Sequence, residues 1–155
     1  MIDTNMGATR IDSFSRTAMR AARTAKQWSP GRLAAELGVA VATVRSGERE
    51  TSQRTPEPGT LVHLAAALDV APDALLTTPR SDWNLTDLRV TRGHLQHASA
   101  ALIHVPVDRF SHFESGFARL SDDEITALAD LYEVPVAEVE RCYQRTLAAL
   151  KSRTP

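Results

Sequence analysis

Apolar residues recur at helical spacing through the first half of the chain. Five segments place apolar side chains three or four positions apart or in a short closing turn: 16–26, 30–37, 41–49, 60–68 and 72–76. Such spacing buries one face of a helix against a core. No segment alternates apolar and polar residues between hairpin turns, which is the pattern of strands. We therefore expect an all-α fold.

The same pattern returns in the second half. An offset of 66 residues aligns Arg23 with Arg89 and Glu48 with Glu114, and the offset falls to 64 beyond the third helix. Two ordered copies indicate an internal duplication. We expect two tandem five-helix domains, with these boundaries: a flexible N-terminal arm (1–15), domain 1 (16–76), a linker (77–83) and domain 2 with an extended last helix (84–151).

Each copy contains two short helices separated by a three-residue break, which is the helix-turn-helix pattern. The first copy reads RxxxxWS-x3-LA-x2-LGV-x3-TV-x3-E and then TL-x2-LA-x-AL-x-V-x2-D-x-LL; the second reads LR-x3-G-x6-A-x4-V-x8-E-x-G and then I-x2-LA-x2-Y-x-V-x4-V. The first pattern resembles the lambda-repressor-like helix-turn-helix domains of the phage repressor/Cro and XRE regulator family, and the second resembles them less closely. The resemblance covers about 130 of the 155 residues.

This resemblance implies that the third helix of each copy enters the major groove of DNA. The implied base-facing residues are Val41, Ala42, Arg45 and Ser46 in the first copy, and Val107, Asp108, Arg109, Ser111 and His112 in the second. The implied phosphate contacts are Ser29, Thr43 and Gln96, with Pro30 on the same surface and with Arg32, Arg49 and Arg54 adding positive charge. Arg45 and Arg109 are the expected guanine readers, because guanine presents two acceptors in the major groove.

The resemblance also implies one structural ion pair in each copy. Arg23 precedes Glu48 by 25 residues, and Arg89 precedes Glu114 by the same distance. In this family those positions tie the first helix to the end of the third. A bidentate, charge-assisted pair suits that role.

Several residues depart from the family pattern. Gly47 stands where a large apolar residue is expected, as Phe113 is in the second copy, and Glu50 replaces a glycine just beyond the third helix. We expect the third helix of the first copy to end early or to become ordered on DNA. In the second copy, Leu95 replaces a capping serine and His104 replaces the turn glycine.

Charge, cysteine content and apolar run length bear on how the chain could bind nucleic acid and on the compartment in which it works. The chain has 18 Lys and Arg against 19 Asp and Glu, and 16 of those cations are Arg. Any binding to nucleic acid therefore depends on local placement of arginines, since the overall field is weak. A single cysteine, Cys142, excludes an internal disulfide, and no apolar run has the ~20 residues of a membrane helix. We expect a cytoplasmic protein.

Catalytic and metal-binding motifs are not recognisable. His94, His97, His104 and His112 lack an accompanying cluster of cysteines or carboxylates, and no glycine-rich phosphate loop is present. We expect no metal, no cofactor and no enzymatic activity.

The sequence predicts a DNA-binding transcriptional regulator, with repression as the expected outcome. Either both copies read adjacent half-sites, or the first binds DNA while the second forms a homodimer through its last helix. The apolar stripe on that helix contains Val139, Cys142, Tyr143, Leu147 and Leu150, and it packs either on its own domain or on a second chain. The alternative function is a protein-interaction module on a helix-turn-helix scaffold that does not bind DNA.

Overall fold

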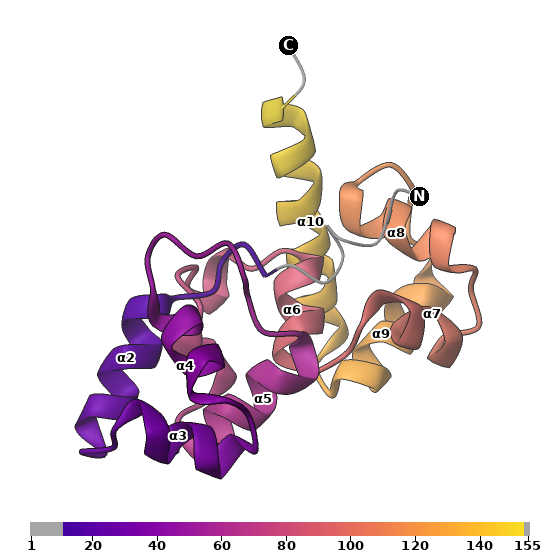
Figure 1. Cartoon of the computed structure of the whole chain (residues 1–155). Helices are drawn as coiled ribbons and strands as arrows, with labels where there is room; N and C mark the ends of the chain where they lie inside the picture. Colours follow the sequence, from indigo (N-terminus) through magenta and orange to yellow (C-terminus); the bar gives the residue numbers. More distant parts are fainter. Residues whose placement is uncertain (1–10, 154–155) are drawn as a thin grey trace, which may run out of the picture. The chain divides into compact units, whose positions relative to one another are not determined.

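The computed structural model describes residues 11–153, and the chain divides into two compact units between Pro79 and Arg80 (Figure 1). Within the described residues, all regular structure is helical except for one isolated bridge between Phe14 and Leu76. The predicted all-α fold is confirmed. None of the described helices is long and apolar enough to cross a membrane.

Over its described residues, 11–79, unit 1 contains four α-helices and a short 3-10 helix. They are α2 (Arg16–Ala25), α3 (Pro30–Leu37), α4 (Val41–Glu48), α5 (Pro58–Ala67) and η1 (Pro72–Leu75). Ser15 and Ser29 cap α2 and α3 by accepting backbone N–H groups with their side chains. The apolar faces meet in a core that includes Met19, Leu33, Val44, Leu61, Leu64 and Leu75.

The segment just before α2 belongs to this core, which corrects part of the prediction of a flexible arm over residues 1–15. Ile11 and Phe14 are buried, and the Ser15 N–H donates to the Leu75 carbonyl at 2.7 Å. The Thr77 N–H donates to the Ser13 carbonyl at 2.6 Å. These bonds fix the segment beside the end of η1. The rest of the predicted arm, residues 1–10, lies outside the described residues.

Unit 2 contains a short 3-10 helix and five α-helices. They are η2 (Arg80–Asp82), α6 (Leu85–Thr91), α7 (Gln96–Leu102), α8 (Val107–Ser115), α9 (Asp122–Tyr132) and α10 (Val136–Arg153). Capping boxes begin α6, through Asn84 and Asp87, and α9, through Ser121 and Glu124. The predicted linker over 77–83 is too long, because Trp83 is 1% exposed and forms part of the core of unit 2.

The last helix, α10, packs against its own unit, on α6, α8 and α9. Val139 and Tyr143 from the predicted dimer stripe are buried, and Leu150 packs over Gly116. The Thr146 hydroxyl accepts the Leu85 N–H at 3.1 Å and so joins α10 to the start of α6. The prediction of a homodimer through this stripe is therefore not supported, because unit 2 itself buries Val139 and Tyr143 and half-buries Leu147 and Leu150.

From the second helix of each unit onward, corresponding helices begin at matching offsets. The offset is 66 residues between α3 and α7 and between α4 and α8, and 64 between α5 and α9 and between η1 and α10. Residues in the left-handed backbone conformation follow the same offsets: Gln27 with Gly93, Gly38 with His104, and Asp69 with Glu133. The first, second and fourth helices of both units thus end in the same kind of turn.

Substitutions at Gly38 and at its counterpart His104 can measure the free-energy cost of the left-handed backbone conformation. A Cβ added at Gly38 meets nothing within 4 Å, so the substitution Gly38→Ala adds only backbone strain. We expect a loss of about 1 kcal/mol in the free energy of unfolding, measured by urea titration. His104→Ala is the matched control, because His104 already carries a Cβ at φ 62°. Equal losses in the two variants would contradict this account.

Candidate nucleic-acid interface

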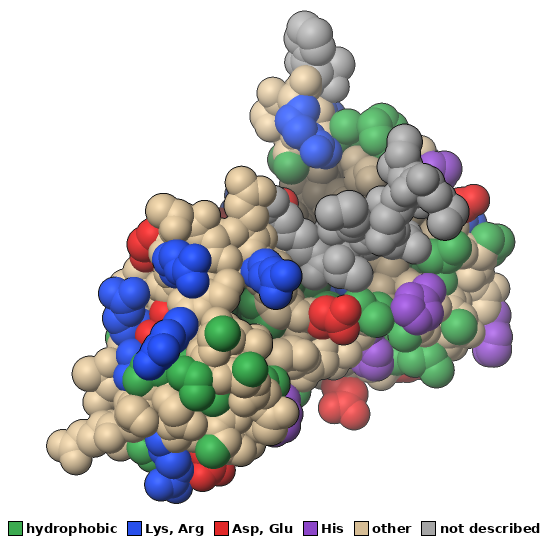
Figure 2. Space-filling model, in the orientation of Figure 1, with side chains coloured by type: hydrophobic (Ala, Val, Ile, Leu, Met, Phe, Trp, Pro, Cys, Tyr) green, Lys and Arg blue, Asp and Glu red, His purple; other side chains and the backbone are tan. Residues whose placement is uncertain are grey.

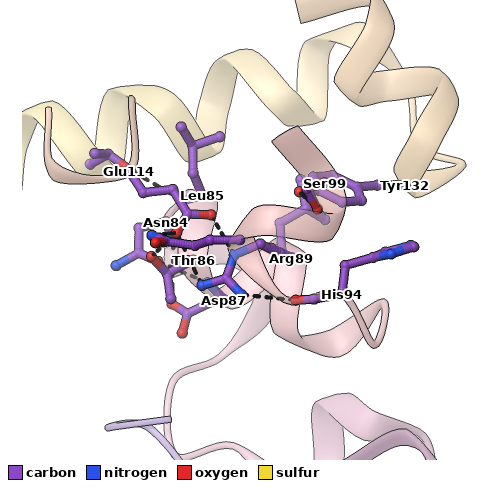
Figure 3. A network of polar contacts seen from close by, with 12 residues as sticks. Asn84, Leu85, Thr86, Asp87, Arg89, His94, Ser99, Glu114 and Tyr132 are labelled. Atoms are coloured by element: carbon purple, nitrogen blue, oxygen red, sulfur yellow. Dashed lines mark hydrogen bonds and ion pairs between the residues drawn. The ribbon is translucent and has the colours of Figure 1, made fainter. Parts of the chain in front are cut away.

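A buried arginine–glutamate pair ties α6 to the end of α8 in unit 2 (Figure 3). Arg89 Nε donates to Glu114 Oε2 at 2.7 Å and Arg89 Nη2 donates to Oε1 at 3.1 Å. Arg89 Nη1 donates to the His94 carbonyl at 2.8 Å, and the two charged side chains are only 1% and 4% exposed. Low exposure removes the screening by water that weakens surface pairs.

Unit 1 contains the same arrangement at the corresponding residues. Arg23 Nε donates to Glu48 Oε2 at 2.6 Å, and Arg23 Nη2 donates to Oε1 at 2.8 Å. Arg23 Nη1 donates to the Trp28 carbonyl at 2.7 Å. The hydrogen bond to Glu48 raises the pKa of Arg23 despite opposing desolvation. Each pair fixes its third helix against the first helix and the adjoining turn.

In unit 1, arginines on α4 and in the loop that follows it are exposed. Arg45, Arg49 and Arg54 form no side-chain hydrogen bond or ion pair with any described residue. Figure 2 shows Lys and Arg side chains gathered over this part of unit 1, with exposed apolar side chains between them. Ala42 and Thr43 on α4 are also exposed. This surface can therefore offer guanidinium groups to a nucleic acid without breaking existing pairs.

Other residues predicted to contact DNA in unit 1 have local partners. Ser29 caps α3, and Pro30 occupies its first turn. Arg32 pairs with Glu36 at 2.9 Å. The Ser46 hydroxyl lies 3.1 Å from that of Ser52. Val41 is half-buried at the start of α4.

In unit 2, the predicted guanine reader Arg109 is held by a carboxylate. Its Nε and Nη2 each donate to Glu124 at 2.9 Å, and its guanidinium lies 4.8 Å from the Phe113 ring centroid. The Arg109 hydrogen bond is the largest cause lowering the pKa of Glu124. The role of Arg109 as a guanine reader stays a prediction, and reading guanine from this position would require Arg109 to exchange its bidentate pair with Glu124 for the base.

The rest of the predicted surface on α8 carries little positive charge. Asp108 and His112 are exposed, Val107 is 40% exposed, and Ser111 is half-buried. Gln96 was predicted to contact phosphate, but its amide Nε2 donates to Glu114 at 2.9 Å. That bond directs the amide toward the buried ion pair.

Arg16 shapes this surface but was not predicted from the sequence. Arg16 Nη1 donates to the Gly47 carbonyl at 2.8 Å, and Nη2 donates to the Arg54 carbonyl at 2.6 Å. These bonds join the end of α4 to the loop that follows it. The sequence around a basic residue at the start of a helix does not indicate contacts with residues more than 30 positions away.

Two further titratable groups in unit 2 have shifted pKa values. Burial and the nearby Arg89 charge lower the pKa of His94, and burial raises the pKa of the Cys142 thiol to about 11. Across residues 11–153, no group of three or more His, Cys, Asp or Glu is placed to hold a metal ion.

Removing one carboxylate of an ion pair should destabilise unit 2 more than unit 1. Glu114→Gln leaves the Arg89 guanidinium buried without a counter-charge, and we expect a loss of about 3–5 kcal/mol in the free energy of unfolding. Glu48→Gln is the matched variant, and its loss should be smaller because the Arg23 side chain is 13% exposed. Urea unfolding followed by circular dichroism measures both. A larger loss for Glu48→Gln would contradict the burial argument.

The pair between Arg109 and Glu124 should make the stability of unit 2 depend on pH. Because the folded-state pKa of Glu124 lies below the usual value of 4.5, the unfolded state binds more protons in this range. The contribution is present above the usual pKa and is lost as the pH falls through the folded pKa. Arg109→Gln should therefore flatten the loss of unfolding free energy between about pH 5 and 3. Arg119→Gln, which removes a nearby exposed arginine, should leave that slope unchanged.

Comparison with known proteins identifies part of this architecture. Residues 83–142 match the family model of a helix-turn-helix domain, which covers unit 2 from Trp83 into α10. No curated protein and no solved structure matches the chain. Unit 2 therefore contains a helix-turn-helix domain, and this domain suggests a DNA-binding regulator.

Proposed function

We propose that the protein is a sequence-specific DNA-binding transcriptional regulator and that it acts as a repressor. The helix-turn-helix match over 83–142 supports DNA binding, and the resemblance to phage repressors favours repression. We further propose that unit 1 is a second helix-turn-helix domain. Its matching helix offsets, its matching left-handed turns and its equivalent Arg23–Glu48 pair support this assignment.

Unit 1 is the proposed principal DNA reader, and the observation that carries this proposal is the unpaired state of Arg45 on α4. This guanidinium is exposed and forms no ion pair with a described residue. Arg109, its counterpart in function on α8, is paired with Glu124. Bidentate readout of guanine uses two N–H groups of the guanidinium. An arginine without an ion pair can therefore bind guanine without first breaking another hydrogen bond. Arg49 and Arg54 supply phosphate contacts beside it, and these set affinity without reading sequence.

Substitution of Arg45 should weaken specific DNA binding more than substitution of Arg109. We expect Arg45→Ala to reduce affinity for a site selected from a random DNA pool by about 5- to 150-fold, as loss of a base contact does. Arg109→Ala should have a smaller effect. Fluorescence anisotropy at two salt concentrations measures this, and affinity should fall as salt rises.

Arg153→Ala provides the matched control for charge, because Arg153 is an exposed cation at the end of α10. It should leave the affinity for the selected site unchanged. An equal effect of Arg45→Ala and Arg153→Ala would show that net charge, and not base contact, governs binding. An unchanged affinity for Arg45→Ala would remove α4 from the role of reader.

A second candidate function applies to unit 2 and is binding of a protein partner. Leu102 is 56% exposed, Val107 is 40% exposed and Phe117 is 71% exposed. Asp108 adds negative charge to a surface whose arginine is already paired. Both features suit a protein partner better than a phosphate backbone. A DNA footprint of one half-site, retained when α8 is substituted, would favour this role for unit 2.

A further inference from the structure

Unit 1 contains an apolar pocket of about 490 Å³ beside α4. It lies among α4, the loop that follows α4, the start of α5 and the core residues Phe14 and Met19. This volume is within the range of small-molecule binding sites, which is roughly 300–1,000 Å³.

The pocket is located where the two units differ in one large side chain. Gly47 in unit 1 corresponds to Phe113 in unit 2, whose ring is 1% exposed and fills the core. The Met19 thioether lies next to Gly47 instead, with its Sδ 3.2 Å from the position of an added Cβ, and Met19 and Gly47 both line the pocket. An apolar space of this size lacks the contacts that close packing normally provides. An apolar guest restores them.

Among the described residues, the charged ones that line the pocket are two arginines. Arg49 and Arg54 line it together with apolar and hydroxyl-bearing residues, and no described Asp or Glu does so. Neither guanidinium forms an ion pair with a described residue. Two unpaired guanidinium groups next to an apolar space favour a carboxylate, which accepts bidentate hydrogen bonds from arginine.

We propose that this pocket binds a small amphipathic anion, which has an apolar body and a single carboxylate. The apolar body occupies the space beside Gly47 and Val44, and the carboxylate accepts hydrogen bonds from Arg49 and Arg54. A medium-chain fatty carboxylate has this chemistry.

The pocket shares residues with the proposed DNA surface. A bound ligand therefore regulates DNA binding, and this regulatory step rests on the proposed function. Thr43, Ser46, Arg49 and Arg54 belong to both. A bound carboxylate neutralises two arginines that otherwise contact phosphate. Ligand and DNA therefore weaken each other's binding by the same factor, as reciprocal linkage requires.

The test of the site uses decanoate and the full chain, without DNA. Titration followed by heteronuclear NMR should give saturable shifts at residues 42–47 and 54–64. The double substitution Arg49→Gln with Arg54→Gln should weaken decanoate at least about tenfold, since hydrogen bonds to charged groups are lost. Decanamide, the uncharged analogue, should bind weakly and equally to both proteins. Equal affinity of the wild type for decanoate and decanamide would overturn the anionic assignment.

A second variant tests the pocket by filling it. Met19→Leu with Gly47→Phe copies the residues found at the corresponding positions of unit 2, Leu85 and Phe113. It should abolish the decanoate shifts and raise the thermal midpoint of unfolding. Retained decanoate binding in this folded variant, or absence of saturable shifts in the wild type, would overturn the proposal. Shifts of the same residues that depend on protein concentration alone would assign the pocket to a second copy of the chain.

A separate experiment with the selected DNA distinguishes regulation from binding. Decanoate should lower the DNA affinity of the wild type and leave that of the filled variant unchanged. Saturable decanoate binding without any change in DNA affinity would refute the regulatory step and retain the site. If no DNA sequence is selected at all, the proposed function fails, and the NMR titration still decides whether the pocket binds an anion.

Discussion

The bidentate arginine–glutamate pair is the interaction on which both units depend. It joins the first helix to the end of the third, and it also satisfies the carbonyl of Trp28 or His94 in the adjoining turn. A charged pair this deeply buried is unfavourable unless its geometry satisfies nearly every donor and acceptor. Its repetition with the same atoms sets the direction of α4 and α8 relative to the helices before them. The surface offered to a partner is therefore determined by residues that the partner never contacts.

Much of the architecture could be predicted from sequence because it rests on local signals. Apolar spacing located the helices of unit 1 to within about two residues of their ends in the structure. The 25-residue separation of Arg23 and Glu48 was informative because it recurs in the second copy. The errors at Phe14 and Trp83 have a shared cause. Each large side chain stands in a polar segment without periodicity, so the sequence gives no sign of its burial.

The candidate site was harder to predict, because it depends on pairs between distant exposed side chains. Arg45 and Arg109 both lie on the third helices of their units, yet among the described residues only Arg109 is paired with a carboxylate. Glu124 is recognisable as part of a capping box, but no local rule indicates that the same carboxylate also holds an arginine of another helix. A family resemblance indicates where a residue lies on its helix, but it does not indicate whether the side chain is already paired with another residue. Gln96 is a further example, because its amide donates to Glu114, a partner that the sequence does not indicate.

The bond between Thr146 and the first turn of α6 has a consequence for synthesis on the ribosome. Unit 1 possesses all its described core contacts once Thr77 has emerged, since the last backbone bond that closes it joins Thr77 to Ser13. Unit 2 must wait for α10, because the start of its first helix is satisfied by a hydroxyl 61 residues later in the chain. During synthesis, unit 1 can therefore complete its contacts while unit 2 still lacks its last helix. Independent folding of the earlier half limits mispairing between two halves of similar pattern.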